Sequence, residues 1–181
     1  MNERLSREAW IGAGLARLAE AGVEAVRVES LARALGVTKG SFYWHFADRT
    51  ALLAAMLETW RAATTTAIID EVERDGGTAG DRLRRLSLIV AGIDGRPDNA
   101  MRAWAATDVT VATAIAEMDA TRLAYLEKLY AEIGFDPSNA RARAEFVYQA
   151  LVGRFALNPA PLSAEKRAER LEILVPLLTR R

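Results

Sequence analysis

The stretch that decides the fold is RVESLARALGVTKGSFYWHFADR, residues 27–49. Its first half carries apolar side chains at the i, i+3, i+4 and i+7 spacing of a helix: Val28, Leu31, Ala32 and Leu35. Gly36 then supplies a residue that easily adopts the left-handed conformation at the end of a helix. The pattern predicts two short helices joined by a tight turn. That is the layout of a helix-turn-helix, whose second helix enters the major groove of DNA.

The second of these helices carries aromatic side chains in two directions. Phe42 and Phe46 lie four residues apart, so they share one face, which we expect to be buried. Successive residues of a helix are about 100° apart, so Tyr43 and Trp44 must project sideways or outward. Lys39 can reach a guanine edge or a phosphate. The spacing alone leaves two interpretations equally open, namely contact with DNA and an ordinary aromatic core.

A family resemblance separates the two interpretations. The run GVTKGSFYWHF, residues 36–46, is followed by ADRTALL, residues 47–53. Together with the preceding helices, from Ser6 onward, this run resembles the N-terminal domain of the TetR family of one-component transcriptional regulators. The resemblance covers just over a quarter of the chain. It implies that the helix after the turn faces DNA.

Carried over by position, the resemblance implies a set of DNA-contacting residues. The helix after the turn contributes Thr38, Lys39, Ser41, Tyr43, Trp44 and His45. Arg49 stands where the family has a lysine that touches a phosphate, and arginine can make that contact with a different geometry. At the N-cap of the preceding helix the family has Ser or Thr, whereas this chain has Arg27. Its side chain could meet the phosphate instead.

The rest of the chain also reads as helix, so we predict an all-α fold of about nine helices. Ser6, Asp48 and Ser163 are typical N-caps, and Thr38 could cap the short helix that follows it. The runs DGGTAG (residues 75–80) and DGRPDN (residues 94–99) indicate loops. Asp136-Pro137 begins a helix that Asn158-Pro159 should end, and Pro176 should kink or end the last one.

The resemblance also implies two domains. Residues 1–53 would form the helix-turn-helix DNA-binding domain, and residues 54–181 a helical ligand-binding and dimerisation domain. Large side chains that could line a pocket for a small-molecule effector are Trp60, Met101, Trp104, Met118, Tyr125 and Tyr148. A stripe that either pairs with a second copy or packs inside the chain comprises Ala140, Ala144, Val147, Leu151 and Phe155.

Composition excludes several other classes of protein. The chain of 181 residues has no Cys and one His, so thiolate catalysis, disulfides and sites with several His ligands are excluded. Lys plus Arg equals Asp plus Glu at 24 each, which excludes a polycation; the cluster Arg82, Arg84 and Arg85 is typical of a solvated face. We therefore expect no enzyme, no catalytic residue, no metal and no cofactor. Without a signal peptide or an apolar run of membrane length, a cytoplasmic location is expected.

These observations favour a homodimeric DNA-binding transcriptional regulator. We expect a repressor that binds a near-palindromic double-stranded operator and releases it when a small molecule occupies the C-terminal domain. The alternative is a helical protein–protein interaction module without DNA binding. Retention on heparin or on random duplex DNA at low salt would discriminate between the two.

Overall fold

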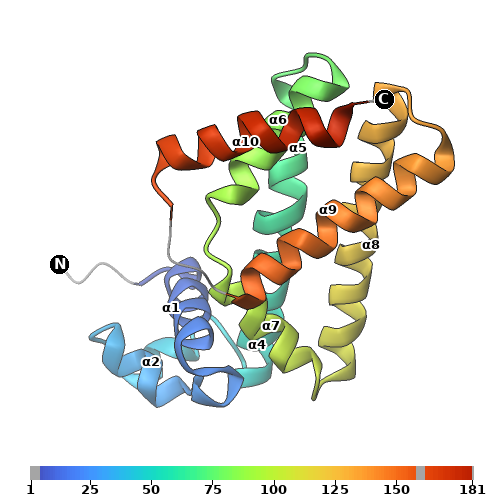
Figure 1. Cartoon of the computed structure of the whole chain (residues 1–181). Coiled ribbons are helices and arrows are strands. Elements are labelled where there is room, and N and C mark those ends of the chain that lie inside the picture. The colour runs from blue at the N-terminus through green and yellow to red at the C-terminus, as the bar shows by residue number, and fades with distance from the viewer. Residues whose placement is uncertain (1–4, 158–161, 181) are drawn as a thin grey trace. The chain divides into compact units, whose positions relative to one another are not determined.

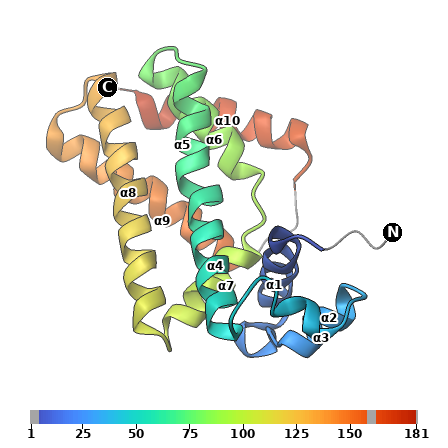
Figure 2. The same ribbon diagram turned by 180° about the vertical axis from the view of Figure 1, so that it is seen from behind.

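The structure, a computed structural model, describes residues 5–157 and 162–180. Within these ranges it consists of helices without any strand (Figure 1). In chain order the elements are α1 (Arg7–Ala21), the 3₁₀ turn η1 (Val23–Ala25), α2 (Val28–Ala34), α3 (Lys39–Phe42), α4 (Arg49–Arg61), the π turn η2 (Ala62–Thr66), α5 (Ala67–Arg74), α6 (Ala79–Ala91), α7 (Arg96–Ala105), α8 (Val109–Ile133), α9 (Pro137–Leu157) and α10 (Ala164–Thr179). Because α4, η2 and α5 run on as one helix (Figure 2), the described residues hold nine helices. The predicted all-α class is confirmed.

The contacts divide the chain into two compact units. The first unit runs to Ala63 and includes Arg96–Ile115, and the second comprises Thr64–Gly95 and the chain from Ala116 onward. The boundaries therefore fall inside η2 and inside α8. These units are defined by contacts and not by function, so the boundary between a DNA-binding and a ligand-binding domain at residues 53 and 54 stays a prediction.

The core of the first unit is built on α1, which packs against α4 and α7. Its fully buried side chains include Trp10, Leu18, Leu52, Met56 and Met101. α1 and α4 approach closely at Gly14, where an added Cβ would lie 2.6 Å from the Sδ of Met56. Because Gly14 has no side chain, the backbone of α1 can contact the Met56 side chain of α4 directly.

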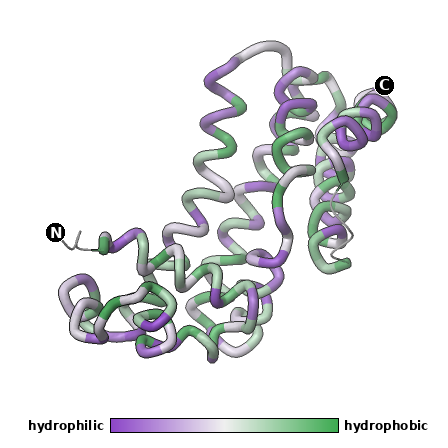
Figure 3. The backbone as a smooth tube through the Cα atoms, turned by 90° about the vertical axis from the view of Figure 1, so that its left-hand side faces the viewer, coloured by the Kyte–Doolittle hydropathy of each residue, from purple (hydrophilic) through white to green (hydrophobic). Residues whose placement is uncertain are grey.

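The core of the second unit lies among α5, α6, α8 and α9, with α10 packed against α6. The small residues Ala140 and Ala144 of α9 point into this core, and Phe155 is also buried within the chain. Of the two interpretations of that stripe, packing inside the chain is confirmed for these three residues. Hydrophobic and hydrophilic residues alternate along the helices (Figure 3). No described helix combines the length and the apolar character that crossing a bilayer requires.

Several helix ends follow the predicted signals. The side chain of Ser6 accepts a hydrogen bond from the amide of Ala9, Asp48 from Ala51, and Ser163 from Lys166. Thr38 is the N-cap residue of α3, as predicted, but its side chain makes no capping hydrogen bond. Pro176 does not end the last helix, which continues to Thr179. The predicted stop at Asn158-Pro159 lies outside the described residues.

The π turn η2 changes the spacing of buried residues along its helix. Within α4 and within α5, buried positions follow each other at three or four residues, as from Met56 to Trp60 and from Ile68 to Val72. Between Trp60 and Thr65 the step is five residues. Arg122 of α8 binds this turn: its Nε donates to Thr65 Oγ1 at 3.0 Å and its Nη2 to the carbonyl oxygen of Thr64 at 3.1 Å.

The close approach at Gly14 makes a prediction about stability. Gly14→Ala forces the buried Met56 side chain to move, so the free energy of unfolding should fall by about 1–3 kcal/mol. Gly12→Ala is the matched control in the same helix, because an added Cβ there meets nothing within 4 Å. That variant should be stabilised by about 0.5–1 kcal/mol through helix propensity. Urea denaturation of both variants measures the difference, and equal stabilities would contradict the packing described.

Candidate nucleic-acid interface

The short helix α3 is held by an aromatic cluster consisting of Trp10, Phe42 and Phe46. All three side chains are buried. The rings of Phe42 and Phe46 stack with centroids 5.4 Å apart, and Phe42 meets Trp10 edge to face at 5.2 Å. Such aromatic pairs contribute beyond the area they bury. The predicted burial of Phe42 and Phe46 is confirmed, and it fixes the orientation of α3.

The neighbouring aromatic side chains point outward. Tyr43 is 55% exposed and Trp44 is 81% exposed, which confirms the predicted projection. The Tyr43 ring still touches the edge of Phe42, at 5.3 Å between centroids. A surface hollow of about 490 Å³ lies beside them, and its lining is Thr38, Gly40, Ser41, Trp44 and His45. Four of these five residues belong to the predicted DNA-contacting set.

The turn between α2 and α3 is closed by backbone hydrogen bonds. The amide of Val37 donates to the carbonyl of Ala32 at 3.0 Å, and that of Gly36 donates to Arg33 at 3.2 Å. Gly36 has a φ of 67°, which is the left-handed conformation expected of a glycine at the end of a helix. The turn therefore sets the angle between α2 and α3 through the backbone.

Lys39, at the first position of α3, forms an ion pair with Glu29 in the first turn of α2. The hydrogen bond to Glu29, followed by the charge of that carboxylate, raises the pKa of Lys39. The hydrogen bonds from Lys39 and from its own backbone amide lower the pKa of the Glu29 carboxyl. Both groups are therefore charged near neutral pH. No pattern in the sequence predicted this contact, because it joins two helices across the turn.

The two predicted arginine contacts lie at the edges of the helix-turn-helix. Arg49 is half-buried, and its Nε and Nη2 donate to the carbonyl oxygens of Val26 and Val23, each at 2.7 Å. Arg49 thus ties the start of α4 to the turn before α2. Arg27 is exposed and donates from Nε to the carbonyl of Glu24 at 3.1 Å, without capping α2. Phosphate contact by either residue stays a prediction.

The predicted pocket residues are all buried, but they fall into two groups. Trp60, Met101 and Trp104 belong to the first unit, whereas Met118, Tyr125 and Tyr148 belong to the second. The hydroxyl of Tyr148 donates to Asp119 Oδ1 at 2.5 Å. Burial, followed by the bond to Asp119, raises the pKa of Tyr148; burial also raises the pKa of Tyr125, and Glu73 raises it further. Ligand contact by the six residues stays a prediction.

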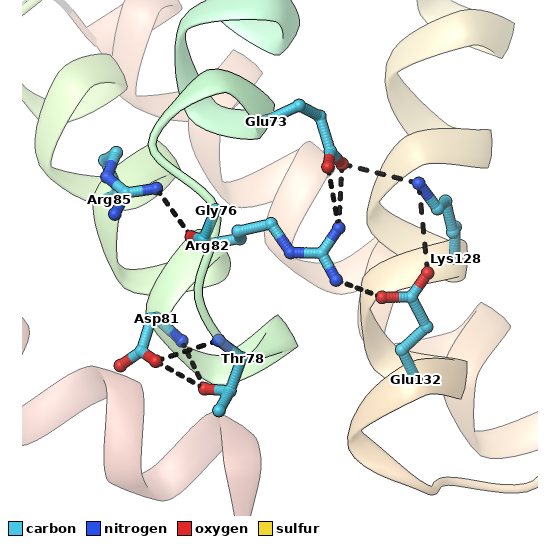
Figure 4. A network of polar contacts seen from close by, with 8 residues as sticks. All are labelled: Glu73, Gly76, Thr78, Asp81, Arg82, Arg85, Lys128 and Glu132. Carbon is cyan, nitrogen blue, oxygen red and sulfur yellow. Dashed lines mark hydrogen bonds and ion pairs between the residues drawn. The ribbon is translucent and has the colours of Figure 1, made fainter.

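Charged side chains also form a network in the second unit (Figure 4). Arg82 donates to Glu73 at 2.8 Å and pairs with Glu132, while Lys128 lies 3.4 Å from Glu73. The Arg82 side chain is mostly buried. The prediction of a solvated basic face is therefore wrong for Arg82, which joins α5, α6 and α8. Its partners lie 9 and 50 residues away in sequence, so no local pattern could reveal them.

The helix-turn-helix is similar to that of known bacterial regulatory proteins. The sequence profile described as "Bacterial regulatory proteins, tetR family" matches residues 11–56. The tetracycline repressor protein class C of Escherichia coli is 42% identical over 55 residues, which are 30% of this chain and 25% of that protein. The match thus spans about a quarter of the length of this curated relative.

Solved structures extend the likeness to the whole chain. A putative TetR-family transcriptional regulator from Rhodococcus sp. is 25% identical with a TM-score of 0.68, and the match covers 98% of this chain and 100% of that one. The transcriptional regulator FadR from Bacillus subtilis, in complex with stearoyl-CoA, has the same fold, with a TM-score of 0.68 at 16% identity over 97% of this chain and 98% of that one. The helix-turn-helix of this chain therefore matches the profile of the TetR family of bacterial regulatory proteins, and nearly the whole chain shares the fold of a solved TetR-family regulator.

Proposed function

We propose that this protein is a DNA-binding transcriptional repressor that responds to a small molecule. The observation that carries the proposal is the pairing of a rigidly held α3 with outward-facing Tyr43 and Trp44. The TetR family profile matches residues 11–56, which include this segment. The proposal assigns no catalytic residue, metal or cofactor, and it places the protein in the cytoplasm with its DNA.

The proposed DNA face combines side chains of complementary chemistry. Lys39 and the hydroxyls of Thr38, Ser41 and Tyr43 can donate to phosphates or base edges, and Trp44 and His45 flank the hollow beside them. Arg27 and Arg49 would add phosphate contacts at the two ends. A protein–protein module would also expose aromatic side chains. Only the DNA-binding function, however, predicts an affinity that falls steeply with salt.

Trp44 offers a direct test of DNA binding. All four tryptophans lie in the first unit, and the other three, Trp10, Trp60 and Trp104, are buried. Acrylamide should therefore quench mostly the fluorescence of Trp44. Duplex DNA at low salt should suppress this quenching, because it covers α3, and added salt should restore it.

Trp44→Phe is the control for this measurement, since it should lose the accessible quenching with or without DNA. The DNA-binding function fails if duplex DNA leaves the quenching of the natural protein unchanged at low salt. The protein–protein alternative would then be favoured.

We propose that a second copy of the chain covers the outer faces of α9 and α10. The outer apolar stripe of α9 consists of Phe146, Ala150, Gly153 and Leu157, spaced at i, i+4, i+7 and i+11. On α10, Ile173, Leu174 and Leu177 are exposed. Exposed apolar side chains in such number on two helices of one unit are typical of an interface. The small residues in the middle of the stripe allow two helices to approach closely, and a two-fold dimer matches a near-palindromic operator.

Charge placed in this surface should dissociate the dimer. Phe146→Glu and Leu177→Glu would each bury an unpaired carboxylate at the interface, at a cost of about 2–5 kcal/mol, or roughly 30-fold or more in the dimer dissociation constant. Val109→Glu is the control, because Val109 is 81% exposed but lies on α8 in the first unit. Sedimentation should show monomers for the first two variants only. Dimers of unchanged strength in both would contradict the proposed interface.

The second unit is the proposed site of effector binding. Large side chains fill its core, and the hydroxyl of Tyr130 is buried there without a hydrogen-bond partner among the described residues. Burial raises the pKa of Tyr130 to about 12, so this hydroxyl keeps its proton and can donate to a ligand. The same fold in FadR accompanies a bound acyl-CoA. Met118, Tyr125 and Tyr148 stay the proposed contacts in this unit.

Effector binding should weaken DNA binding. Apolar, aromatic and mildly cationic compounds that raise the melting temperature of the protein should lower its affinity for DNA by about 5- to 150-fold, the usual range of coupling between two sites. Reciprocity requires DNA to weaken the compound by the same factor. Fluorescence anisotropy of labelled duplex, with and without each compound, measures the first factor. Stabilising compounds that never alter DNA affinity would leave a DNA-binding protein without ligand control.

A further inference from the structure

The ion pair between Lys39 and Glu29 occupies the middle of the proposed DNA face. The Nζ of Lys39 contacts the Oε1 of Glu29 across the turn at Gly36, and the two side chains are 49% and 61% exposed. The lysine comes from the helix proposed to enter the major groove, and the carboxylate comes from the helix before it. DNA that reaches Lys39 must therefore also meet Glu29.

Glu29 stands out among the charges of this segment. Residues 27–49 contain four basic side chains and two acidic ones. The other acidic residue, Asp48, is used as the N-cap of α4, where its Oδ1 accepts from the amide of Ala51 at 2.8 Å. Glu29 lies in the first turn of α2, where its carboxylate also accepts from its own backbone amide, but its side-chain partner is a residue proposed to bind DNA. A carboxylate there works against the attraction between the protein and the phosphates.

We propose that Glu29 is a specificity-determining residue, which lets Lys39 bind DNA fully only where the edge of a base pair meets both side chains. This inference rests on the proposed DNA-binding function. Phosphate oxygens are acceptors only, so a phosphate can receive Lys39 but leaves Glu29 repelled and without a donor. In the major groove a base pair presents both acceptors and an amino donor, in positions that differ from one base pair to another. A base pair whose pattern matches the two side chains can therefore receive a hydrogen bond from Lys39 and donate one to Glu29.

The two kinds of DNA complex should therefore respond differently to loss of the carboxylate. On random duplex, where phosphates dominate, Glu29 keeps Lys39 neutralised and removes one phosphate contact per subunit. One such contact is worth about 0.9 in the slope of log affinity against log salt, or roughly 8-fold in affinity at 0.1 M salt. On the operator, the carboxylate contributes a hydrogen bond that offsets its repulsion.

The test compares Glu29→Gln with the natural protein, full-length in both cases, on random duplex and on an operator obtained by selection from genomic DNA. The variant should bind random duplex about 8-fold more tightly per subunit at 0.1 M salt, with a salt slope steeper by about 0.9. Its affinity for the operator should rise less or fall. Repeating the selection with the variant should relax the preference for one base pair at one position of each half-site.

Two further variants make the test specific. Glu20→Gln removes the same charge from the first unit, but Glu20 pairs with Arg17 on α1 and should leave both affinities unchanged. In a Lys39→Met background, Glu29→Gln should no longer steepen the salt slope, because the carboxylate acts through the lysine.

The inference is overturned if Glu29→Gln leaves the ratio of operator to random affinity unchanged in a protein that binds its operator. An equal effect of Glu29→Gln with and without Lys39 would also overturn it, because Glu29 would then act only as a repulsive charge. Failure of the proposed function looks different, since the natural protein itself would then bind no duplex at any salt concentration.

Discussion

The proposed DNA face depends on the aromatic cluster of Trp10, Phe42 and Phe46. A helix as short as α3 cannot be stable alone, because helix nucleation is unfavourable and only longer segments recover its cost. The buried side chains of the cluster supply the stability that a longer helix would gain from its own length. Since Trp10 belongs to α1, the core of the first unit determines the position of α3. Every outward side chain of α3 therefore has a direction that the core determines.

This arrangement explains how the exposed groups of α3 can be ordered before DNA binds. Tyr43 packs against Phe42 in a T-shaped arrangement of the two rings while more than half of the residue stays exposed. The Schellman-type turn at Gly36 keeps α2 at a defined angle, and Arg49 ties the start of α4 to the residues before α2. A binding surface ordered in advance loses less conformational entropy on association than a flexible one. The proposed DNA face has that property.

Sequence reasoning succeeded where the signal is local. The burial of Phe42 and Phe46, the outward Tyr43 and Trp44, and the caps at Ser6 and Asp48 all follow from spacing within one or two turns. It failed where the partner lies beyond a turn. The pairing of Glu29 with Lys39 depends on the angle between two helices, and Arg49 binds carbonyls 23 and 26 residues away. The π turn was missed for another reason, since its only trace is a single five-residue step between buried positions.

That π turn has a consequence for how the chain can change in length. A helix turns by about 100° per residue, so the extra residue in η2 sets the rotational phase of everything that follows it. Deleting one residue of Ala62–Thr66 would allow a regular α-helix through this segment. Helix propensity alone would then predict that the shortened helix is at least as stable as the natural one. The same deletion would rotate Ile68 and Val72 out of the core of the second unit and would take Thr64 and Thr65 out of register with Arg122. In this helix the number of residues, more than their identity, determines which side is buried.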